Sequence, residues 1–188
     1  MHDAPVLALA PALSPASVIV ARGVHIKPLA RLERLQLGLA LPNAQTAADL
    51  EQRLEFQLPW GPSWTQVGAV SVFALGSRAW LLEGHTLAPV RAKLGSDLRA
   101  LGANAVDVSD AFEAFRLTGD EAASLLATGC SIDLHPSAFA VGACARALLA
   151  RLDVVLTAVA TGYDVRVERS YAPHLWAWFE NAAREFGR

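Results

Sequence analysis

Apolar and polar residues alternate along several segments of the chain, and this period of two predicts β-strands with one buried face. Residues 34–41 show it most clearly, because a leucine stands at every second position. Residues 67–75 and 79–82 show the same alternation on either side of Gly76 and Ser77, which predict a turn. The first half of the chain is therefore expected to contain a sheet.

The second half of the chain contains five further strand-like segments. They are residues 105–108, 112–117, 143–149, 152–159 and 163–169. The last three follow one another too closely for a crossover helix, which parallel neighbours would need. An α+β fold, mainly antiparallel sheet with packed helices, is therefore predicted.

Four segments between these strands predict helices. Residues 46–54 predict a short one, and residues 89–102 a longer one that begins with proline and ends with glycine. The helix expected within residues 118–129 follows a Thr-Gly-Asp-Glu sequence, which is typical of a capping box. A last helix is expected over residues 173–186, and residues 130–142 predict a long loop of the kind that often carries a function.

The composition indicates that other protein chains cover part of the surface. Only 18% of the 188 residues are charged, against about 25% in ordinary soluble domains. The net charge of −2 argues against nucleic acid, which favours a basic partner. The apolar share of 53% excludes a disordered chain. A surface short of charge is expected to be partly covered, so the composition favours a subunit of a complex.

The N-terminal segment does not resemble a membrane span or a signal peptide. Residues 4–21 carry no charge but contain three prolines, and no basic region precedes them. We interpret residues 1–27 as an extended arm and residues 28–188 as the domain, which could comprise two small α+β lobes over residues 28–102 and 103–188. Cys130 and Cys144 form no CxxC pair, and two buried thiols in a reducing cytoplasm are expected.

The search for catalytic motifs gives no convincing site. The sequence has no GxGxxG, no GxxxxGK[ST] and no GxSxG motif. Asp133 and His135 could place two metal ligands on one side of a segment, but a loop role through backbone amides is favoured. The carboxylates of Asp107 and Asp110 could do acid–base work, although a turn is the simpler interpretation. The five tryptophans could stack a flat heteroaromatic ring such as a pterin, or they fill the core and interfaces.

Several of these segments resemble the hallmark sequences of the sarcosine oxidase gamma subunit family. The most specific are LATGCSIDLHPSAF and VGACAR, at residues 126–139 and 141–146. The others are residues 75–76, 80–82, 106–110, 115–119, 122–126, 169–173 and Trp176. The likeness runs from Pro28 to the end of the chain. Ser131 and Ala140 stand where the family has prolines, and Ala147 where it often has threonine.

The resemblance implies a subunit of the bacterial heterotetrameric enzyme that demethylates sarcosine to glycine, forming methylenetetrahydrofolate and hydrogen peroxide. It implies alpha, beta and delta subunits as partners, with FAD, FMN, NAD, tetrahydrofolate and zinc held in those subunits and none in this chain. The expected fold resembles the folate-binding region of glycine-cleavage aminomethyltransferases. No catalytic, cofactor-binding or metal-binding residue is expected here, so the role is assembly and scaffolding.

Two alternatives remain open. The chain could be a free-standing folate-binding or aminomethyltransferase-like protein, although function resides in a site and not in a fold. The chain could also serve the same role in a complex that acts on another N-methylated amino acid.

Three residues are candidates for a loop or interface role: Asp133, His135 and Trp176. Asp133 is expected to hold the 130–142 loop through backbone amides, and the loop is expected to face a partner or a vestigial pocket. At 100° per residue, Leu175, Trp178 and Phe179 share one stripe of the last helix, which should pack on the sheet. Trp176 lies at the edge of this stripe, where it could either belong to the core or anchor a neighbouring subunit, and the anchor is favoured.

Overall fold

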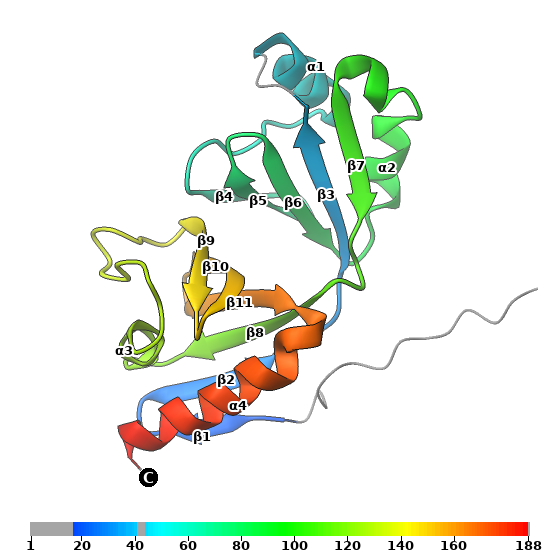
Figure 1. Ribbon diagram of the computed structural model, residues 1–188. Helices are drawn as coiled ribbons and strands as arrows, with labels where there is room; N and C mark the ends of the chain where they lie inside the picture. Colours follow the sequence, from blue (N-terminus) through cyan, green and yellow to red (C-terminus); the bar gives the residue numbers. More distant parts are fainter. Residues whose placement is uncertain (1–16, 41–43, 188) are drawn as a thin grey trace, which may run out of the picture.

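Two antiparallel sheets face each other, with helices on their outer faces (Figure 1). The structure is a computed structural model that describes residues 17–40 and 44–187. Every pair of neighbouring strands within these residues is antiparallel. The α+β class expected from the sequence is confirmed.

One sheet has six strands within the described residues. Their order is β1 (Ile19–Ala21), β2 (Val24–Pro28), β8 (Phe112–Thr118), β11 (Gly162–Glu168), β10 (Leu152–Val159) and β9 (Cys144–Leu149). The last three strands form consecutive hairpins as predicted, with bounds within one residue of the expected ones. One face is covered by α3 (Ala122–Ala127) and α4 (Ala172–Ala183), with short 3-10 turns η2 (Arg169–Tyr171) and η3 (Arg184–Phe186) at the two ends of α4.

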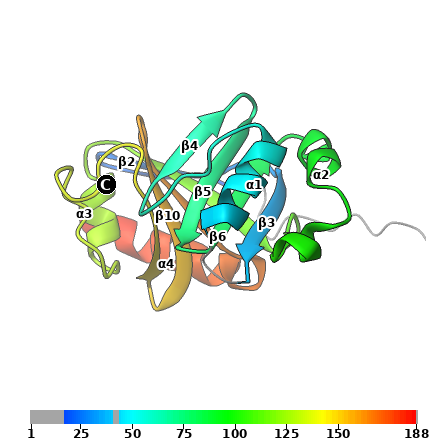
Figure 2. The same ribbon diagram turned by 90° about the horizontal axis from the view of Figure 1, so that it is seen from above.

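The other sheet has five strands in the part of the chain that the structure describes. Their order is β4 (Trp64–Val67), β5 (Val70–Gly76), β6 (Ala79–Gly84), β3 (Glu33–Leu39) and β7 (Ala103–Asp107). Its outer face is covered by α1 (Ala44–Leu54), α2 (Ala88–Leu94) and the 3-10 turn η1 (Leu98–Leu101). Figure 2 shows α1 lying across β5 and β6. Each sheet therefore has its own apolar core under its helices.

A smaller apolar cluster joins the inner faces of the two sheets. Phe73 and Leu81 from the five-stranded sheet pack with Cys144 and Val155 from the six-stranded one. The connection is reinforced by backbone hydrogen bonds at one end, where Cys144 N donates to Pro62 O at 3.0 Å. The two sheets are thus in direct contact at this end of the space between them.

The N-terminal boundary differs from the expected one. The arm proposed over residues 1–27 includes β1 and most of β2, which pair with each other and with β8 and so belong to the six-stranded sheet. Residues 1–16 lie outside the described residues. The boundary between the lobes also moves, because β7 pairs with β3 and the chain changes sheets after Asp107 and not at residue 102.

The strand predicted over residues 67–75 is wrong at its start. Val67 pairs with Val70 across a two-residue turn, so β4 and β5 are separate strands of a hairpin. Gly68 has φ of 58°, a conformation that such hairpin turns require and that glycine adopts without strain. The alternation of apolar residues continues through the turn and hides it from the sequence.

Two helix predictions also need correction. The helix expected over residues 89–102 ends at Leu94, because Gly95 follows it with φ of 68°, and only η1 continues beyond. The capping box is absent: Thr118 stays paired in β8, and Glu121 stands at the N-cap of α3 without a side-chain hydrogen bond.

None of the helices within residues 17–40 and 44–187 is long and apolar enough to cross a membrane.

Candidate functional site

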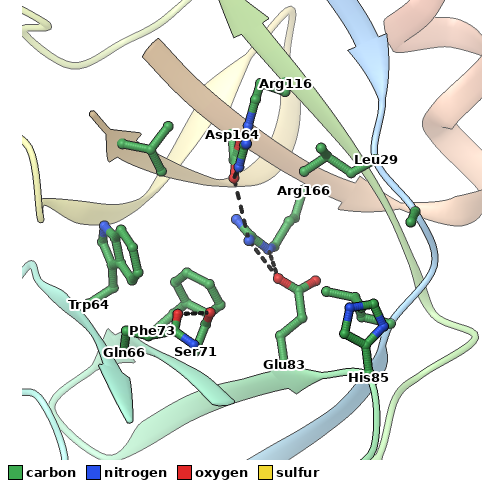
Figure 3. Close-up of a pocket in the computed structure, with 13 residues that line it drawn as sticks. Leu29, Trp64, Gln66, Ser71, Phe73, Glu83, His85, Arg116, Asp164 and Arg166 are labelled. Carbon is green, nitrogen blue, oxygen red and sulfur yellow. Dashed lines mark hydrogen bonds and ion pairs between the residues drawn. The ribbon is translucent and has the colours of Figure 1, made fainter. Parts of the chain in front are cut away.

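Charged side chains from both sheets meet in the layer between them (Figure 3). Arg166 on β11 donates to Glu83 Oε2 on β6 through Nε at 3.1 Å and Nη2 at 2.6 Å. Arg34 on β3 donates from Nε to Glu83 Oε1 at 2.7 Å. All three side chains are buried, so Glu83 ties two guanidinium groups together in the interior.

A second ion pair extends this cluster toward solvent. Arg116 on β8 forms a bidentate pair with Asp164 on β11, with Nε to Oδ1 at 2.6 Å and Nη2 to Oδ2 at 2.8 Å. Asp164 Oδ2 lies 4.0 Å from Arg166 Nη2, which connects the two pairs. We call Arg34, Glu83, Arg166, Asp164 and Arg116 the inter-sheet cluster. Its outermost member is Arg116, whose side chain is 35% exposed.

The alternation of side chains in the strands explains why these charges face inward. On β11, Val165 and Val167 belong to the core beneath α4, so Asp164 and Arg166 point to the opposite face, toward the other sheet. On β6, Leu82 packs under the helices, and its neighbour Glu83 points to the six-stranded sheet. Both sheets are covered on both faces, which buries these charged residues completely.

The surroundings shift several pKa values. Desolvation alone would raise the pKa of Glu83, but the charges and hydrogen bonds of Arg166 and Arg34 outweigh it and hold the pKa below its ordinary value. Desolvation lowers the pKa of Arg34, and the hydrogen bond to Asp164 raises that of Arg116. Burial raises the pKa of the Cys144 thiol to about 12. Glu83 is therefore an anion at neutral pH, and Cys144 is a neutral thiol.

A cavity of about 290 Å³ opens beside the cluster. Its polar wall carries Arg116, Asp164, Arg166 and Glu83, and Trp64 stands on the opposite side (Figure 3). The remaining lining residues are Leu29, Ala30, Leu32, Gln66, Ser71, Phe73, His85 and Val159. The guanidinium carbon of Arg166 lies 4.1 Å from the centre of the Phe73 ring. This cation–π contact helps to hold the Arg166 side chain in place.

The inter-sheet cluster joins strands through ion pairs, and its carboxylates are poorly suited to proton transfer. Each oxygen of Glu83 and of Asp164 accepts a hydrogen bond from an arginine, which stabilises the anion. A general base would instead need a pKa near the working pH. No group of three or more His, Cys, Asp or Glu side chains within the described residues could hold a metal ion.

The structure places Asp133 and His135 on the exposed surface of the 130–142 loop, away from the inter-sheet cluster. Asp133 Oδ1 accepts a hydrogen bond from the backbone N–H of His135 at 2.8 Å, so the expected amide contact is present, at one amide. His135 Nδ1 lies 2.7 Å from Ser137 Oγ. These contacts give the loop local order, and their interface role stays a prediction.

The structure places Trp176 in the core, which is the less favoured of the two alternatives given for it. Trp176 is 8% exposed in the core of its own chain, its ring is 5.7 Å from that of Phe115, and its Nε1 donates to Glu180. Trp178, expected in the core, is only partly buried. The buried residues of α4 include Leu175, Trp176 and Phe179, and the rings of Trp176 and Phe179 both contact that of Phe115 on β8.

Two other candidates have structural roles. Asp107 Oδ1 accepts hydrogen bonds from Ser109 N and Oγ, and these bonds lower the pKa of Asp107, as the turn interpretation requires.

The tryptophans do not converge on one site. Trp80 is buried under α1, and the ring of Trp60 packs edge-on against it. Among the tryptophans, Trp64 alone lines the cavity.

Sequence reasoning missed the whole inter-sheet cluster. On β11, Asp164 and Arg166 alternate with valines, and on β6 Glu83 follows Trp80-Leu81-Leu82. Such alternation is equally typical of a strand whose polar face is exposed to solvent, so it gives no sign that the charges are buried. The partners are 83 residues apart in the sequence, so only the fold shows that they meet.

Comparisons with known proteins identify the family of the chain. The sequence profile of the "sarcosine oxidase, gamma subunit family" matches residues 38–185. This range covers most of the chain, from the end of β3 to the end of α4. The chain belongs to this family. No curated protein gives a significant match.

Solved structures show the same relationship. A chain of heterotetrameric sarcosine oxidase from Corynebacterium sp. U-96, solved with pyrrole 2-carboxylate, is 25% identical with a TM-score of 0.80. The match covers 91% of this family member and 89% of that chain. The glycine cleavage system aminomethyltransferase T from Bartonella henselae is 12% identical with a TM-score of 0.52, covering 84% of this chain and 45% of that one. The second likeness shows a shared fold, as the sequence had suggested.

Proposed function

We propose that this chain is the gamma subunit of a heterotetrameric sarcosine oxidase and that it serves assembly and scaffolding without catalytic residues of its own. The observation that carries the proposal is the structural likeness to a chain of such an oxidase, at a TM-score of 0.80 over 91% of this chain. Membership of the gamma subunit family supports it. The partners are then the alpha, beta and delta subunits.

The proposed complex converts sarcosine to glycine, with methylenetetrahydrofolate and hydrogen peroxide as further products, and it acts in the cytoplasm. Its FAD, FMN, NAD, tetrahydrofolate and zinc are assigned to the partner subunits. The pairing of every carboxylate oxygen in the inter-sheet cluster with arginine supports a structural role for this chain. The chain should accordingly be colourless and free of metal when purified alone.

Exposed apolar side chains on the edge strands support the assembly role. Val20 on β1, Val106 on β7 and Leu148 on β9 are each at least half exposed, and all three strands are edges of their sheets. Edge strands with apolar side chains promote association, and monomeric proteins usually protect them with charge. Partner subunits that cover these edges would remove the exposed apolar surface.

The assembly role is tested by expressing the chain with the alpha, beta and delta subunits and isolating the complex through a tag on another subunit. Leu148→Lys, on an edge strand, should reduce recovery of the chain in the complex. Ser124→Lys, at an exposed position of α3, is the matched control and should leave recovery unchanged. Equal recovery of both variants and wild type would remove β9 from the interface.

A separate measurement tests the absence of catalysis. The isolated chain should show no flavin absorption, no stoichiometric zinc and no binding of tetrahydrofolate at micromolar concentration. Micromolar binding of tetrahydrofolate would instead favour the folate-binding alternative and end the scaffold-only proposal. Asp133→Ala and His135→Ala in the complex test whether the 130–142 loop contributes to assembly.

A further inference from the structure

The cavity between the sheets has features of a binding site that the assembly role does not use. It lies at a junction of two structural units, where ligand sites are common. Its volume of about 290 Å³ is at the lower end of the ~300–1,000 Å³ of small-molecule pockets. One wall is polar and charged and another is aromatic (Figure 3).

The charges beside the cavity do not balance. Within the hydrogen-bonded inter-sheet cluster, three guanidinium groups, of Arg34, Arg116 and Arg166, share only two carboxylates, of Glu83 and Asp164. The cluster therefore carries one excess positive charge, and its outermost guanidinium, that of Arg116, is 35% exposed at the edge of the cavity. A guanidinium that is partly shielded from water pairs more strongly with an anion than one in bulk water does, so the site favours a monoanion.

Arg116 is the member with unused donors facing the cavity. A guanidinium has five N–H groups, and Asp164 takes one from Nε and one from Nη2. Nη1 of Arg116 makes no hydrogen bond to any residue that the structure describes. Because Asp164 fixes the plane of the guanidinium, the remaining N–H groups are pre-oriented for a second planar anion, and a carboxylate matches this geometry.

The aromatic wall is also held in place. Trp64 Nε1 donates to the backbone oxygen of Ala158 at 3.1 Å, and the indole lies 5.7 Å from the ring of Phe73 with a tilt of 31°. The indole is only partly buried, so an apolar surface remains available within the cavity. Leu29, Leu32 and Val159 add aliphatic surface around it.

We propose that this cavity binds a small carboxylic acid with a flat apolar body, whose carboxylate pairs with Arg116 and whose body packs against Trp64. The ligand supplies the negative charge that the inter-sheet cluster lacks. A cationic ligand does not fit, because the four carboxylate oxygens are already occupied by arginines. The proposal requires no chemistry at the site and does not depend on the assembly role.

Benzoate is the probe, with benzamide as its neutral counterpart of nearly equal shape. Calorimetric titration of the full chain should show benzoate binding about 10- to 100-fold more tightly than benzamide, which is the usual range for a charge-assisted hydrogen bond. Arg116→Gln should remove this difference. Arg99→Gln, at an exposed position of η1, should retain it. Equal affinity of the two probes for the wild type would overturn the proposal.

Arg116→Gln leaves the buried Asp164 without its partner, so its folding must be checked by circular dichroism. Two measurements keep the test decisive if the variant does not fold. Arg116→Lys keeps the positive charge but lacks the planar pair of N–H donors of a guanidinium. This variant should stay folded and bind benzoate more weakly. In ¹H–¹⁵N spectra of the wild type, benzoate should shift the indole resonance of Trp64 and leave that of Trp176 in place. An unmoved Trp64 resonance at saturating benzoate would refute this site.

Discussion

Arg166 on β11 and Glu83 on β6 form an ion pair that links the two sheets, with Nη2 and Oε2 2.6 Å apart. The side chains are only 3% and 4% exposed. Arg34 donates to the other oxygen of Glu83, so one carboxylate is hydrogen-bonded to two buried cations. Asp164 lies farther from Arg166, at 4.0 Å, and is itself held by Arg116. The link between the two sheets at this point therefore depends mainly on Glu83.

Glu83→Gln should destabilise the chain strongly. The amide removes the charge to which both guanidinium groups are hydrogen-bonded, and Asp164 lies near only one of them, at 4.0 Å from Arg166. Breaking a buried pair from one side costs about 3–5 kcal/mol. Urea unfolding followed by tryptophan fluorescence measures the loss. Glu55→Gln is the matched control, because Glu55 is 74% exposed in its pair with Lys93 and such pairs contribute about 0–1 kcal/mol. Similar losses in both variants would contradict the role given to Glu83.

The stability of the chain should fall in acid. The pKa of Glu83 is held below its ordinary value of 4.5, so the unfolded chain takes up the proton first. The stabilisation is fully present above pH 4.5 and is lost as the pH falls through the folded-state pKa. Unfolding free energies between pH 7 and pH 3 should show this loss in the wild type and a smaller one in Glu83→Gln.

Asp97 contributes to the same acid range and provides the control. Its hydrogen bonds with Arg53 lower its pKa from 3.8 to about 2, although the pair is exposed. Asp97→Asn should leave most of the pH dependence intact. If Asp97→Asn removed it and Glu83→Gln did not, the buried pair would not be its source.

The two cysteines should differ in reactivity. Burial raises the pKa of Cys144 to about 12, and its Sγ contacts the backbone oxygen of Ala74 at 3.6 Å. Since the thiolate is the reactive form, Cys144 should resist a disulfide reagent such as DTNB at pH 8 until the chain unfolds. The expectation that both thiols are buried holds for Cys144 only: Cys130 is partly exposed and should react first. Cys130→Ser should abolish the fast phase; a fast phase that persists would place Cys144 within reach of solvent.

The elements that the sequence predicts well are those whose pattern is local. The hairpins of β9, β10 and β11 follow directly from alternation and short connections, and Pro173 marks the beginning of α4 within one residue. The turn at Gly68 was missed because the alternation runs through it. The capping box at Thr118 failed because strand pairing with Gly162 outweighs the local preference.

The candidate site could not be derived in this way. Glu83 and Arg166 are adjacent only because the two sheets face each other, and no local pattern encodes how the sheets pack. Asp164 and Arg166 follow the ordinary alternation of a half-buried strand, so neither their burial nor their partners could be inferred from the sequence. The cavity follows from the same packing, since its walls come from both sheets.

The buried face of α4 is rotated slightly from the one expected, and this changes which tryptophan lies in the core. A stripe calculated at 100° per residue placed Trp178 in the core and Trp176 at its edge. The structure buries Trp176 against Phe115 and leaves Trp178 partly exposed beside Gly129. The ring of Trp178 occupies the place that a side chain at residue 129 would fill.

This placement reverses the expected effects of the two substitutions. Trp176→Ala should lower the unfolding free energy of the isolated chain by about 3–5 kcal/mol, the usual cost of deleting a buried tryptophan. Trp178→Ala removes a partly exposed ring and should cost clearly less. Thermal melts of both variants, with Ala177→Ser as a control at an exposed position of the same helix, measure the difference. A larger loss from Trp178→Ala would show that the core of α4 is centred on that side of the helix after all.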